Sequence, residues 1–396
     1  MLFSMIVLLV VMAIPFTAYP MLLWLRSRLA PQAILRERIT PSVDLVICAH
    51  NEAQAIEAKL LNALALNYPQ VALTIWVASD GSTDATVERA SAYISPRVHV
   101  LDLPRVGKAG ALNHVVSLGE AEIIAFSDAN SIWQEDALLA LVSPLADPEV
   151  GGAAGDQRYE KASAQNSGER GYWRFDRVLK SWQSRAGNVI SATGAIYCVR
   201  RELFEPAPPD ATDDFMVSTA VIAAGKRLVF AEDAVAVEPA AAAASIEFQR
   251  KVRVISRGLR SVWYRRALLN PANHGLYALE LLVHKLWRRL VWIPLLALVL
   301  ISPFALSSGV LMNRPLSSDG VAALISAAVL TFTFTAALAV FWTSVRRYRV
   351  FSIPGFVLMV NVACAVAAYK FVTGQRMTKW SLPRDFKPAP GSEKES

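Results

Sequence analysis

Charged residues and cysteines are scarce in this chain of 396 residues. Only 18% of the residues are charged against 54% that are hydrophobic, a balance that excludes an ordinary soluble enzyme. The three cysteines, Cys48, Cys198 and Cys364, lack the spacing of a metal site and require no disulfide, which fits a reducing cytosol. No Gly-x-Gly-x-x-Gly follows the first predicted strand, so a dehydrogenase is disfavoured.

The hydrophobic residues are concentrated in blocks that are long enough to cross a bilayer with about 30 Å of hydrocarbon. The first block lacks a basic segment before it and is followed by arginines, which is typical of an uncleaved anchor whose next domain stays in the cytoplasm. We therefore expect an integral protein of the cell's inner membrane with a cytoplasmic central domain. The blocks cover residues 2–25, 291–312, 321–345 and 350–372.

Basic residues beside these blocks account for most of the net charge of +7. We expect them to contact anionic membrane lipids, and we expect no nucleic acid as a partner. Four full spans would place the C-terminus outside, although the basic tail belongs in the cytoplasm by the positive-inside rule. Because Pro354 and Gly355 lie early in the last block, that block is either a span or a re-entrant segment.

The central segment alternates predicted strands with predicted helices. This alternation indicates an α/β domain with a parallel sheet covered by helices on both faces. From residue 150 the pattern is less regular, and its glycines at 151–155 and prolines at 206–209 suggest a second, adaptable half. The predicted strands are 43–48, 71–78, 98–103 and 123–127, and the predicted helices are 52–64, 83–94 and 110–118.

Polar side chains follow the first two strands at the points where they end. The run from Ser79 to Asp84 contains Asp80, a turn glycine and two hydroxyls, and His50 and Glu52 follow the preceding strand. Capping of the next helix explains either set when it is taken alone. Two such sets at one edge of an open sheet indicate a ligand, because ligands bind at the carboxyl ends of the strands.

Two further motifs carry groups that suit phosphate and a metal ion. Gly107 and Lys108 open a predicted helix and offer N–H groups and an ammonium to phosphate oxygens, although the spacing is not that of a P-loop. Asp128 and Asn130 follow the strand at 123–127, and oxygen ligands at this spacing point the same way. They suit a hard divalent cation, with an Asx turn as the alternative.

The last polar motif of the central segment is the pair Asp213 and Asp214, which precedes an apolar run. One reading is a helix cap formed by the two carboxylates. The other is a general base, since such a base requires a carboxylate held close to an acceptor hydroxyl.

A basic helix is predicted near residue 255. Arg250, Arg253, Arg257 and Arg260 recur at steps of three and four, with apolar residues on the opposite side. This pattern predicts an interfacial amphipathic helix whose apolar face contacts lipid or a neighbouring helix and whose arginines face lipid headgroups. Alternatively, Arg253 and Arg250 bind the diphosphate of a donor or a lipid phosphate.

Over residues 41–258 the chain resembles the membrane-bound inverting glycosyltransferases of family 2. That group contains the chitin, cellulose, hyaluronan and poly-N-acetylglucosamine synthases together with many single-transfer enzymes. The resemblance implies a GT-A fold, which is a Rossmann-like nucleotide-sugar-binding domain, with flanking transmembrane helices. It is carried by His50-Asn51-Glu52, the run 79–84, Gly107-Lys108, Asp128-Ala129-Asn130, Thr193-Gly194-Ala195 and Asp213-Asp214.

The family further implies a nucleotide-sugar donor, commonly a UDP-sugar, and a lipid-linked or glycan acceptor. By this resemblance Asp128 and Asn130 stand where the family binds Mg²⁺ or Mn²⁺. Asp214 matches the general base and Asp213 the acidic residue before it, in a displacement that inverts the anomeric carbon without a covalent intermediate. The residues that match the donor site are His50, Glu52, Asp80, Lys108 and Asp128.

Two departures from the family bear on the activity. Asn130 replaces the second aspartate of the Asp-x-Asp motif, so an inactive nucleotide-sugar-binding subunit is one alternative. Of the Gln-x-x-Arg-Trp motif only Arg253 is present, which argues against the other alternative, a processive exopolysaccharide synthase. A transporter is disfavoured because the apolar blocks contain almost no polar residues beyond Asn361 and Lys370.

We therefore expect a metal-dependent hexosyltransferase that acts at the cytoplasmic membrane face in glycolipid or cell-surface polysaccharide synthesis. The expected organisation is a transmembrane helix at 1–25, a GT-A domain at 40–240, interfacial amphipathic helices at 241–289, two to three membrane helices at 290–373 and a disordered tail at 383–396.

Overall fold

The computed structural model describes residues 1–159, 167–239, 244–312 and 317–376. The chain divides into two units. The helical unit consists of Met1–Ala30, Ala164–Trp182 and Phe248–Arg376, and the sheet unit consists of Pro31–Ser163, Gln183–Glu247 and Met377–Ser396. The tail predicted to be disordered, 383–396, lies outside the described residues.

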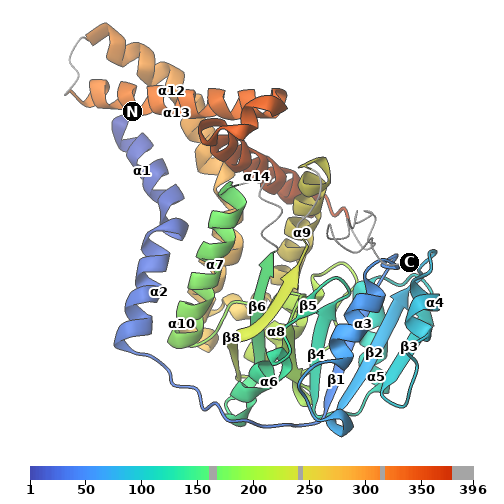
Figure 1. Ribbon diagram of the computed structural model, residues 1–396. Coiled ribbons are helices and arrows are strands. Elements are labelled where there is room, and N and C mark those ends of the chain that lie inside the picture. Colours follow the sequence, from blue (N-terminus) through green and yellow to red (C-terminus); the bar gives the residue numbers. More distant parts are fainter. Residues whose placement is uncertain (160–166, 240–243, 313–316, 377–396) are drawn as a thin grey trace. The chain divides into compact units, whose positions relative to one another are not determined.

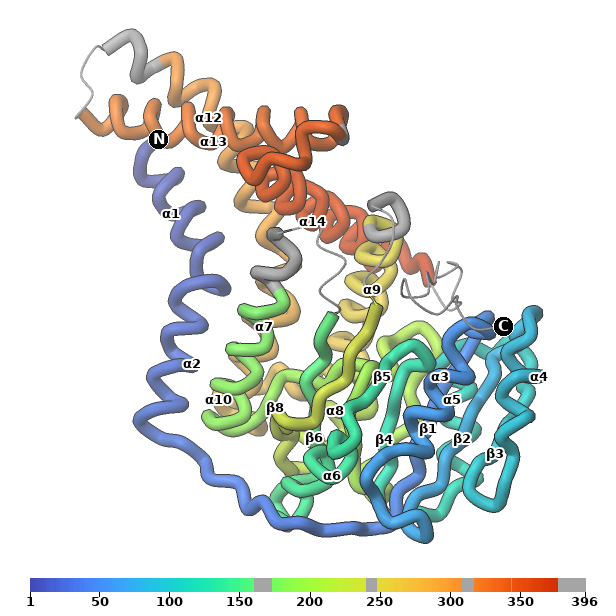
Figure 2. Tube along the Cα trace, in the orientation of Figure 1, coloured from blue at the N-terminus to red at the C-terminus, as the bar shows by residue number. Residues whose placement is uncertain are grey.

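The sheet unit is built on an eight-stranded sheet with the order β3-β2-β1-β4-β7-β6-β8-β5 (Figures 1 and 2). The first four strands are parallel, as the sequence predicts, because a crossover helix connects each of them to the next. The strands are β1 (Val43–Ala49), β2 (Leu73–Asp80), β3 (Val98–Leu103), β4 (Ile123–Asp128), β5 (Ile132–Trp133), β6 (Val150–Tyr159), β7 (Tyr197–Arg200) and β8 (Arg227–Glu238).

The other half of the sheet, for which the sequence predicts no strands, is mixed. Strand β7 runs antiparallel to β4 and β6, β8 is parallel to β6, and β5 is antiparallel to β8. The glycines at 151–155, which suggested an adaptable half, lie in strand β6, most of which is buried. They are needed because neighbouring backbone comes very close: a Cβ on Gly155 would lie 2.6 Å from the carbonyl oxygen of Ala234.

Helices cover both faces of the sheet, as expected. Apolar side chains of α3 and α6 pack with those of the strands in one core cluster, whereas α5 packs on β1 and β2 and α8 packs on β6, β7 and β8 from the other face. Short 3₁₀ turns occupy Gln70–Ala72, Ser143–Ala146 and Arg201–Leu203. The helices are α3 (Ile56–Leu64), α4 (Thr86–Ser91), α5 (Lys108–Leu118), α6 (Ala137–Val142) and α8 (Asp213–Ala223).

The helical unit contains the apolar blocks. Its helices are α1 (Leu2–Ala13), α2 (Ala18–Leu29), most of α7 (Ser167–Ala186), α9 (Ala244–Tyr264), α10 (Pro271–Leu281), α11 (Arg288–Leu290), α12 (Trp292–Met312), α13 (Ser318–Phe341) and α14 (Arg349–Val372). Between them lie 3₁₀ turns at Ile14–Phe16, Arg266–Leu269 and Thr343–Arg347 and a π-helical turn at Leu282–Trp287. Met5 of α1 packs with Leu298 and Ala322 of α12 and α13.

Among the described residues, three helical segments are long and apolar enough to cross a membrane: Leu2–Leu29, Ser318–Phe341 and Arg349–Val372. A bent pair, Pro271–Leu290 and Trp292–Ser307, meets at 41° and is a fourth candidate, either a broken span or a re-entrant loop. The last block is therefore one unbroken helix despite Pro354, and the break lies in the block before α13.

Helix α9 is amphipathic, as predicted, and its apolar face packs within the helical unit. Val252, Leu259 and Val262 are buried. The arginine stripe differs from the expectation, since Arg257 is also buried and Arg260 donates a hydrogen bond to the carbonyl of Gln375 at 2.9 Å. The expected contact of this helix with lipid headgroups stays a prediction.

Candidate functional site

The carboxyl ends of the four parallel strands bring the sequence motifs to one edge of the sheet. Ala49 of β1 pairs in register with Ser79 of β2, and Cys48 of β1 pairs with Asp128 of β4. Asp80 of β2 pairs with Leu103, the last residue of β3. The segments that follow these strands therefore begin side by side, as the sequence predicts.

The first two motifs are joined by hydrogen bonds. His50 Nδ1 lies 2.8 Å from the carbonyl oxygen of Asp80. The Asn51 side-chain oxygen accepts the N–H of Thr83 at 2.8 Å, and the Asn51 N–H donates to Ser82 Oγ at 3.2 Å. Asn51 adopts a positive φ of 54°, which asparagine tolerates better than most residues. The two turns therefore form one structure.

Asp84 caps the helix that follows its turn. Its side chain accepts the N–H of Thr86 at 3.0 Å at the start of α4 and the N–H of Ala53 at 3.1 Å. Burial opposes ionisation of Asp84, but the hydrogen bonds from Thr86 and Ala53 outweigh it and lower the pKa of the carboxyl. The capping interpretation is therefore correct for Asp84, and Glu52 is tied to the same helix through its N–H, which donates to Thr86 Oγ1 at 2.9 Å.

Asp80 is almost fully buried, and only one of its carboxylate oxygens is used within the protein. Oδ1 accepts the N–H groups of Val106 and Gly107 at 2.7 and 2.8 Å. Oδ2 is buried and has no hydrogen-bond partner among the described residues. A buried acceptor left unpaired costs about 1–3 kcal/mol, so this oxygen is suited to a donor supplied by a ligand.

The turn before α5 thus differs from the prediction that its N–H groups face phosphate. Two of those groups are already taken by Asp80. Gly81, with φ at 61°, lets the chain pass close by, because a Cβ there would lie 2.9 Å from the Arg105 nitrogen. The Lys108 ammonium reaches two further motifs, those of Asp128 and Asp213.

Lys108 joins two acidic motifs. Its Nζ lies 2.6 Å from Asp128 Oδ1 and 3.0 Å from Asp213 Oδ2. Burial by itself would lower the pKa of the ammonium, but attraction to Asp128 and Asp213 outweighs burial and raises the pKa. Two carboxylates therefore converge on one cation at the end of β4.

This point of convergence is the place to test for a divalent cation. Asp128 and Asp213 supply carboxylate oxygens, and Asn130 two residues after Asp128 carries an amide oxygen. Hard cations such as Mg²⁺ take such oxygens and complete their shell with water and substrate phosphate. Among the described residues no group of three or more His, Cys, Asp or Glu side chains forms a full metal cage. The residues fit a cation shared with a phosphate ligand.

Asp213 and Asp214 open α8 with different surroundings. Asp213 is buried and paired with Lys108, whereas Asp214 is half-buried and its Oδ1 accepts the N–H of Phe215 at 2.7 Å. Both lie in the first turn, where the helix dipole favours negative charge. The structure therefore brings Asp213 to Lys108 and leaves Asp214 more accessible.

Gly194 explains how a third segment approaches the site. A Cβ at this position would lie 3.1 Å from Lys108 Nζ and 3.3 Å from Asp128 Oδ2. Next to it, the carbonyl oxygen of Ala195 accepts hydrogen bonds from Ser127 Oγ and Trp133 Nε1 at 3.3 and 2.9 Å. Because residue 194 has no side chain, its backbone can lie close to the Lys108 ammonium and the Asp128 carboxylate.

Arg250 and Arg253 belong to α9 of the helical unit, so their predicted contact with a phosphate stays a prediction. The site also contains groups that sequence reasoning missed, namely Lys59, Ser131 and Glu238, which are all buried. Lys59 lies in the helix that the sequence predicts at 52–64 from its apolar periodicity. The residues around Lys59 in the sequence, however, do not distinguish a buried lysine from an exposed one. Its partner is the carbonyl of Ser131, far along the chain.

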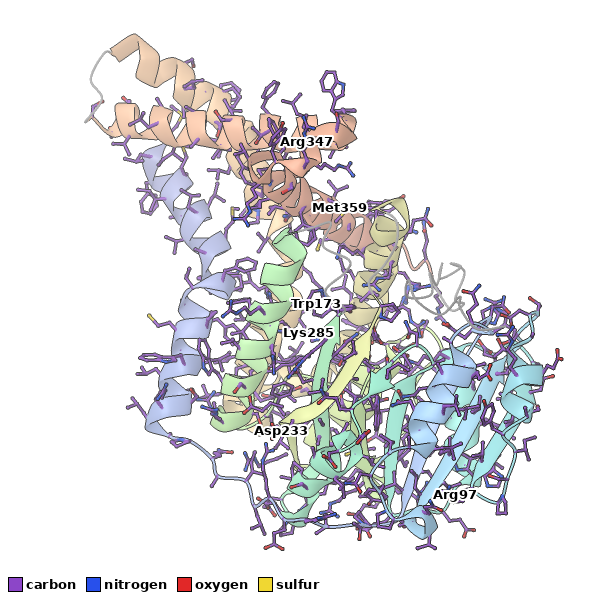
Figure 3. All side chains as sticks on the ribbon, viewed as in Figure 1. Arg97, Trp173, Asp233, Lys285, Arg347 and Met359 are labelled. Carbon is purple, nitrogen blue, oxygen red and sulfur yellow. The ribbon has the colours of Figure 1, made fainter. Side chains whose placement is uncertain are left out.

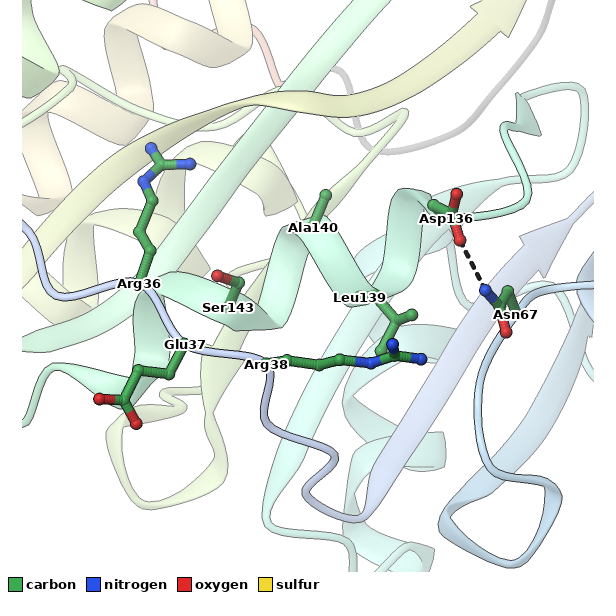
Figure 4. Close-up of a pocket in the computed structure, with 8 residues that line it drawn as sticks. All are labelled: Arg36, Glu37, Arg38, Asn67, Asp136, Leu139, Ala140 and Ser143. Carbon is green, nitrogen blue, oxygen red and sulfur yellow. Dashed lines mark hydrogen bonds between the residues drawn. The ribbon is translucent and has the colours of Figure 1, made fainter.

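A pocket of about 330 Å³ lies elsewhere on the sheet unit (Figure 4). Asn67 and Asp136 are hydrogen-bonded at 2.7 Å on its wall. None of the predicted site residues lines this pocket, so we assign it no part in the chemistry. Its lining residues are Arg36, Glu37, Arg38, Asn67, Asp136, Leu139, Ala140 and Ser143.

Comparison with known proteins finds a family match that lies mostly in the sheet unit. Residues 44–206 match the family model of glycosyl transferase family 2. An N-acetylglucosaminyltransferase of Rhizobium meliloti is 28% identical over 223 residues, which cover 50% of this chain and 51% of that protein. A beta-monoglucosyldiacylglycerol synthase of Nostoc is 30% identical over 173 residues, 42% of this chain and 37% of that protein. The chain thus matches about half or less of the length of these relatives.

A solved structure is similar over nearly the whole chain. The mannosyltransferase of Pyrobaculum calidifontis, in complex with GDP-Man and Mn²⁺, aligns with a TM-score of 0.68 at 23% identity. The alignment covers 94% of this chain and 100% of that chain. This likeness confirms the predicted fold, a GT-A type sheet domain accompanied by apolar helices.

Proposed function

We propose, from the premise that residues 44–206 are a glycosyl transferase family 2 domain, that this chain transfers a sugar from a nucleotide-sugar donor to a lipid-linked or glycan acceptor at a membrane surface. The activity is a hexosyl transfer with inversion at the anomeric carbon, in glycolipid or cell-surface polysaccharide synthesis. The catalytic domain faces the cytoplasm, and the apolar helices anchor it in the inner membrane.

One observation carries this proposal: groups suited to a nucleoside, a phosphate and a cation lie at the same edge of one sheet. Among the described residues the buried Asp80 Oδ2 has no hydrogen-bond partner, and the half-buried Lys108 lies between Asp128 and Asp213. A nucleoside diphosphate suits these groups, since its base carries N–H donors for Asp80 and its phosphates can bind both the Lys108 ammonium and a cation held by the carboxylates. The similar mannosyltransferase was solved with such a ligand.

In this proposal the donor is held by side chains of the first three motifs. Asp80 Oδ2 accepts an N–H of the nucleobase, and its other oxygen keeps the Val106–Gly107 turn in place. His50 and Glu52 line the nucleoside position, and Lys108 binds the diphosphate as a point charge. Each of these groups binds or orients the donor without entering a covalent bond with it.

Asp128 and Asn130, with Asp213 close by, would hold Mg²⁺ or Mn²⁺. When it is bound, such a cation neutralises negative charge on the departing diphosphate. Asn130 is a neutral ligand and attracts the cation less strongly than a second carboxylate would. Asp213 supports the site as the second carboxylate on the Lys108 ammonium.

Asp214 is the general base that removes the proton from the acceptor hydroxyl. Asp213 is buried and already paired with Lys108, so it is poorly placed to take a proton. Asp214 is half-buried, whereas Asp213 is buried, so Asp214 is the more accessible of the two carboxylates. Cys48 lies at the same edge, but burial raises the pKa of its thiol to about 12, so it is not a nucleophile at neutral pH.

The test is transfer of label from a panel of radiolabelled nucleotide sugars into membranes that contain the full chain. Entry of label into the lipid extract would support single transfer to a lipid-linked acceptor. Entry into insoluble polymer would support the processive alternative. Membranes that lack the chain serve as the control for background transferases, and membranes with the Asp214→Asn variant test the assignment of the base.

The outcomes separate the alternatives. If the wild-type chain transfers no sugar from any donor of the panel but still binds a nucleoside diphosphate, the inactive binding subunit is the correct function. If the Asp214→Asn variant transfers sugar as fast as the wild type, the assignment of the base is wrong. Absence of both binding and transfer would contradict the proposed function as a whole.

A further inference from the structure

Lys59 is a lysine in a place where lysine is rarely found. It lies on α3, and its side chain is fully buried at 0% exposure in the core of the sheet unit. Lysine side chains almost always carry their ammonium to water, because burial of an unpaired charge is very costly. We therefore expect the ammonium of a lysine buried this deeply to form a hydrogen bond or ion pair with a specific neighbour.

The neighbour is the turn that carries the predicted metal ligands. Lys59 Nζ donates a hydrogen bond to the carbonyl oxygen of Ser131 at 2.7 Å and lies 4.8 Å from the centre of the Trp133 ring. Ser131 directly follows Asp128-Ala129-Asn130. The ammonium therefore holds the end of the Asp128–Asn130 turn at its backbone.

The same helix holds the next residues of that segment. The Asn62 amide nitrogen donates to the carbonyl of Trp133 at 2.7 Å, and the Trp133 N–H donates to Asn62 Oδ1 at 2.9 Å. Among the described residues, helix α3 therefore makes three hydrogen bonds to residues 131–133, and the one from Lys59 comes from an ionisable group.

A buried carboxylate completes the arrangement. Ser131 Oγ donates a hydrogen bond to Glu238 at the end of β8, and Gln157 Nε2 donates to the other oxygen of Glu238 at 2.7 Å. Burial lowers the pKa of Lys59 to about 7, while attraction to Asp128 and Glu238 works in the opposite direction. The ammonium thus lies within electrostatic reach of the carboxylates on both sides of Ser131.

An apolar residue would fill this space at a lower cost. Replacing buried charges with hydrophobic residues of similar volume is often neutral or stabilising. Stability alone therefore does not explain a lysine here. The contact with the turn at Asp128 does, since a charged donor fixes a carbonyl more firmly than a neutral one.

We propose that Lys59 is a positioning residue for the cation site: its bond to Ser131 fixes the direction in which Asp128 and Asn130 present their oxygens. This inference rests on the proposed function, because the turn needs a fixed direction only if it binds a cation. It adds a residue outside the predicted motifs. Lys59 itself touches neither donor nor acceptor.

The experiment compares the full chain with Lys59→Met in detergent. Electron paramagnetic resonance measures the Mn²⁺ concentration that half-saturates the protein in the presence of GDP or UDP. Binding of the same nucleotides in EDTA is measured separately, together with the midpoint of thermal unfolding. Lys226→Met is the matched control, since Lys226 is a partly exposed lysine of the same unit that contacts Pro148 and Glu149.

For a positioning role, the half-saturating Mn²⁺ concentration of Lys59→Met rises by about 10–100-fold, the range typical of residues that support metal ligands. Nucleotide binding in EDTA and the unfolding midpoint stay close to those of the wild type. Lys226→Met matches the wild type in all three measurements. Unchanged Mn²⁺ binding in folded Lys59→Met would overturn the proposal, as would an equal loss of nucleotide binding in EDTA.

Lys59→Arg keeps the charge but is longer, so we expect it to fall between the wild type and Lys59→Met. If Lys59→Met does not fold, the proposal is tested with Lys59→Arg alone. Mn²⁺ binding by Lys59→Arg equal to that of the wild type would then overturn the proposal. A wild-type chain that binds neither nucleotide, with or without Mn²⁺, would instead contradict the proposed function. The two failures are therefore distinguishable.

Discussion

The two units of this chain carry opposite charge. The helical unit has 22 Lys and Arg against 4 Asp and Glu, whereas the sheet unit has 18 Lys and Arg against 29 Asp and Glu. The overall charge of +7 is therefore the sum of a strongly basic unit and an acidic one. The net charge of the whole chain suggests a basic protein, although the sheet unit, which contains the candidate site, is acidic.

This difference shows how the sheet unit must attract an anionic donor. Net negative charge repels a nucleoside diphosphate at long range, so binding depends on local groups. The Lys108 ammonium is one of these, and a divalent cation at Asp128 would be another. The basic residues of the helical unit suit a different anion, the lipid headgroup, since they flank candidate membrane spans.

The largest expected effect comes from the acidic unit. Asp214→Asn removes the proposed base, and sugar transfer falls by about 10²–10⁴-fold, the usual contribution of a general base. Binding of the nucleotide stays unchanged because Asp214 does not touch the donor. Asp233→Asn is the control, since Asp233 is an exposed carboxylate of β8 (Figure 3). Equal transfer rates in the two variants would contradict the assignment.

A smaller loss is expected when the cation site is weakened. Asp128→Asn removes the carboxylate of the predicted metal ligands, and the Mn²⁺ affinity in the presence of nucleotide falls on the order of 100-fold. Isothermal titration with Mn²⁺ measures this change. Asp102→Asn, at an exposed position of β3, should bind Mn²⁺ like the wild type. If Asp128→Asn keeps the wild-type affinity, the cation binds elsewhere.

A single charge of the basic unit should have a modest effect on lipid contact. Arg347 is an exposed residue of the 3₁₀ turn after α13 (Figure 3). Arg347→Gln is expected to weaken the preference for anionic lipid by about 1 kcal/mol, or roughly fivefold. Quenching of tryptophan fluorescence by brominated phosphatidylglycerol and phosphatidylcholine measures the preference. Arg97→Gln in the sheet unit should leave it unchanged, and a loss there would remove the contrast between the units.

The smallest effect concerns the cap of α4. Asp84→Ala should lower the free energy of unfolding by about 0.5–1 kcal/mol, the low part of the range for helix caps. The pKa of Asp84 in the folded protein is below its usual 3.8, so its stabilisation is complete above that pH and is lost as the pH falls through the lower value. Urea unfolding at pH 7 and below pH 4 tests both statements. A difference between wild type and variant that grows on acidification would contradict them.

The parallel half of the sheet could be predicted because its signals are local. The strand at 98–103 matches β3 in both bounds, and the strands at 43–48 and 123–127 each miss only the last residue. These segments are short apolar runs followed by turn residues. The motif residues at their ends were predictable for the same reason, since parallel strands end at one edge.

The mixed half was not predictable from local signals. Gly152 and Gly155 suggest an adaptable segment when only the sequence is considered. In the structure their lack of a side chain allows the backbone of Cys198 and Ala234, which are distant in sequence, to lie close to them. The buried state of Lys59 likewise depends on Ser131, with which it shares no sequence pattern. In both cases the residue type reflects a partner that only the folded chain brings near.

The hydrogen bonds that join the turns after β1 and β2 have a consequence for protein engineering. His50 contacts the Asp80 backbone, and Asn51 binds both Ser82 and Thr83. A chimaera that exchanges only one of these turns with a homologue would combine surfaces that did not evolve together. The smallest segment that keeps these two turns together runs from the start of β1 to the end of α4, and recombination libraries of this domain should place no crossover within it.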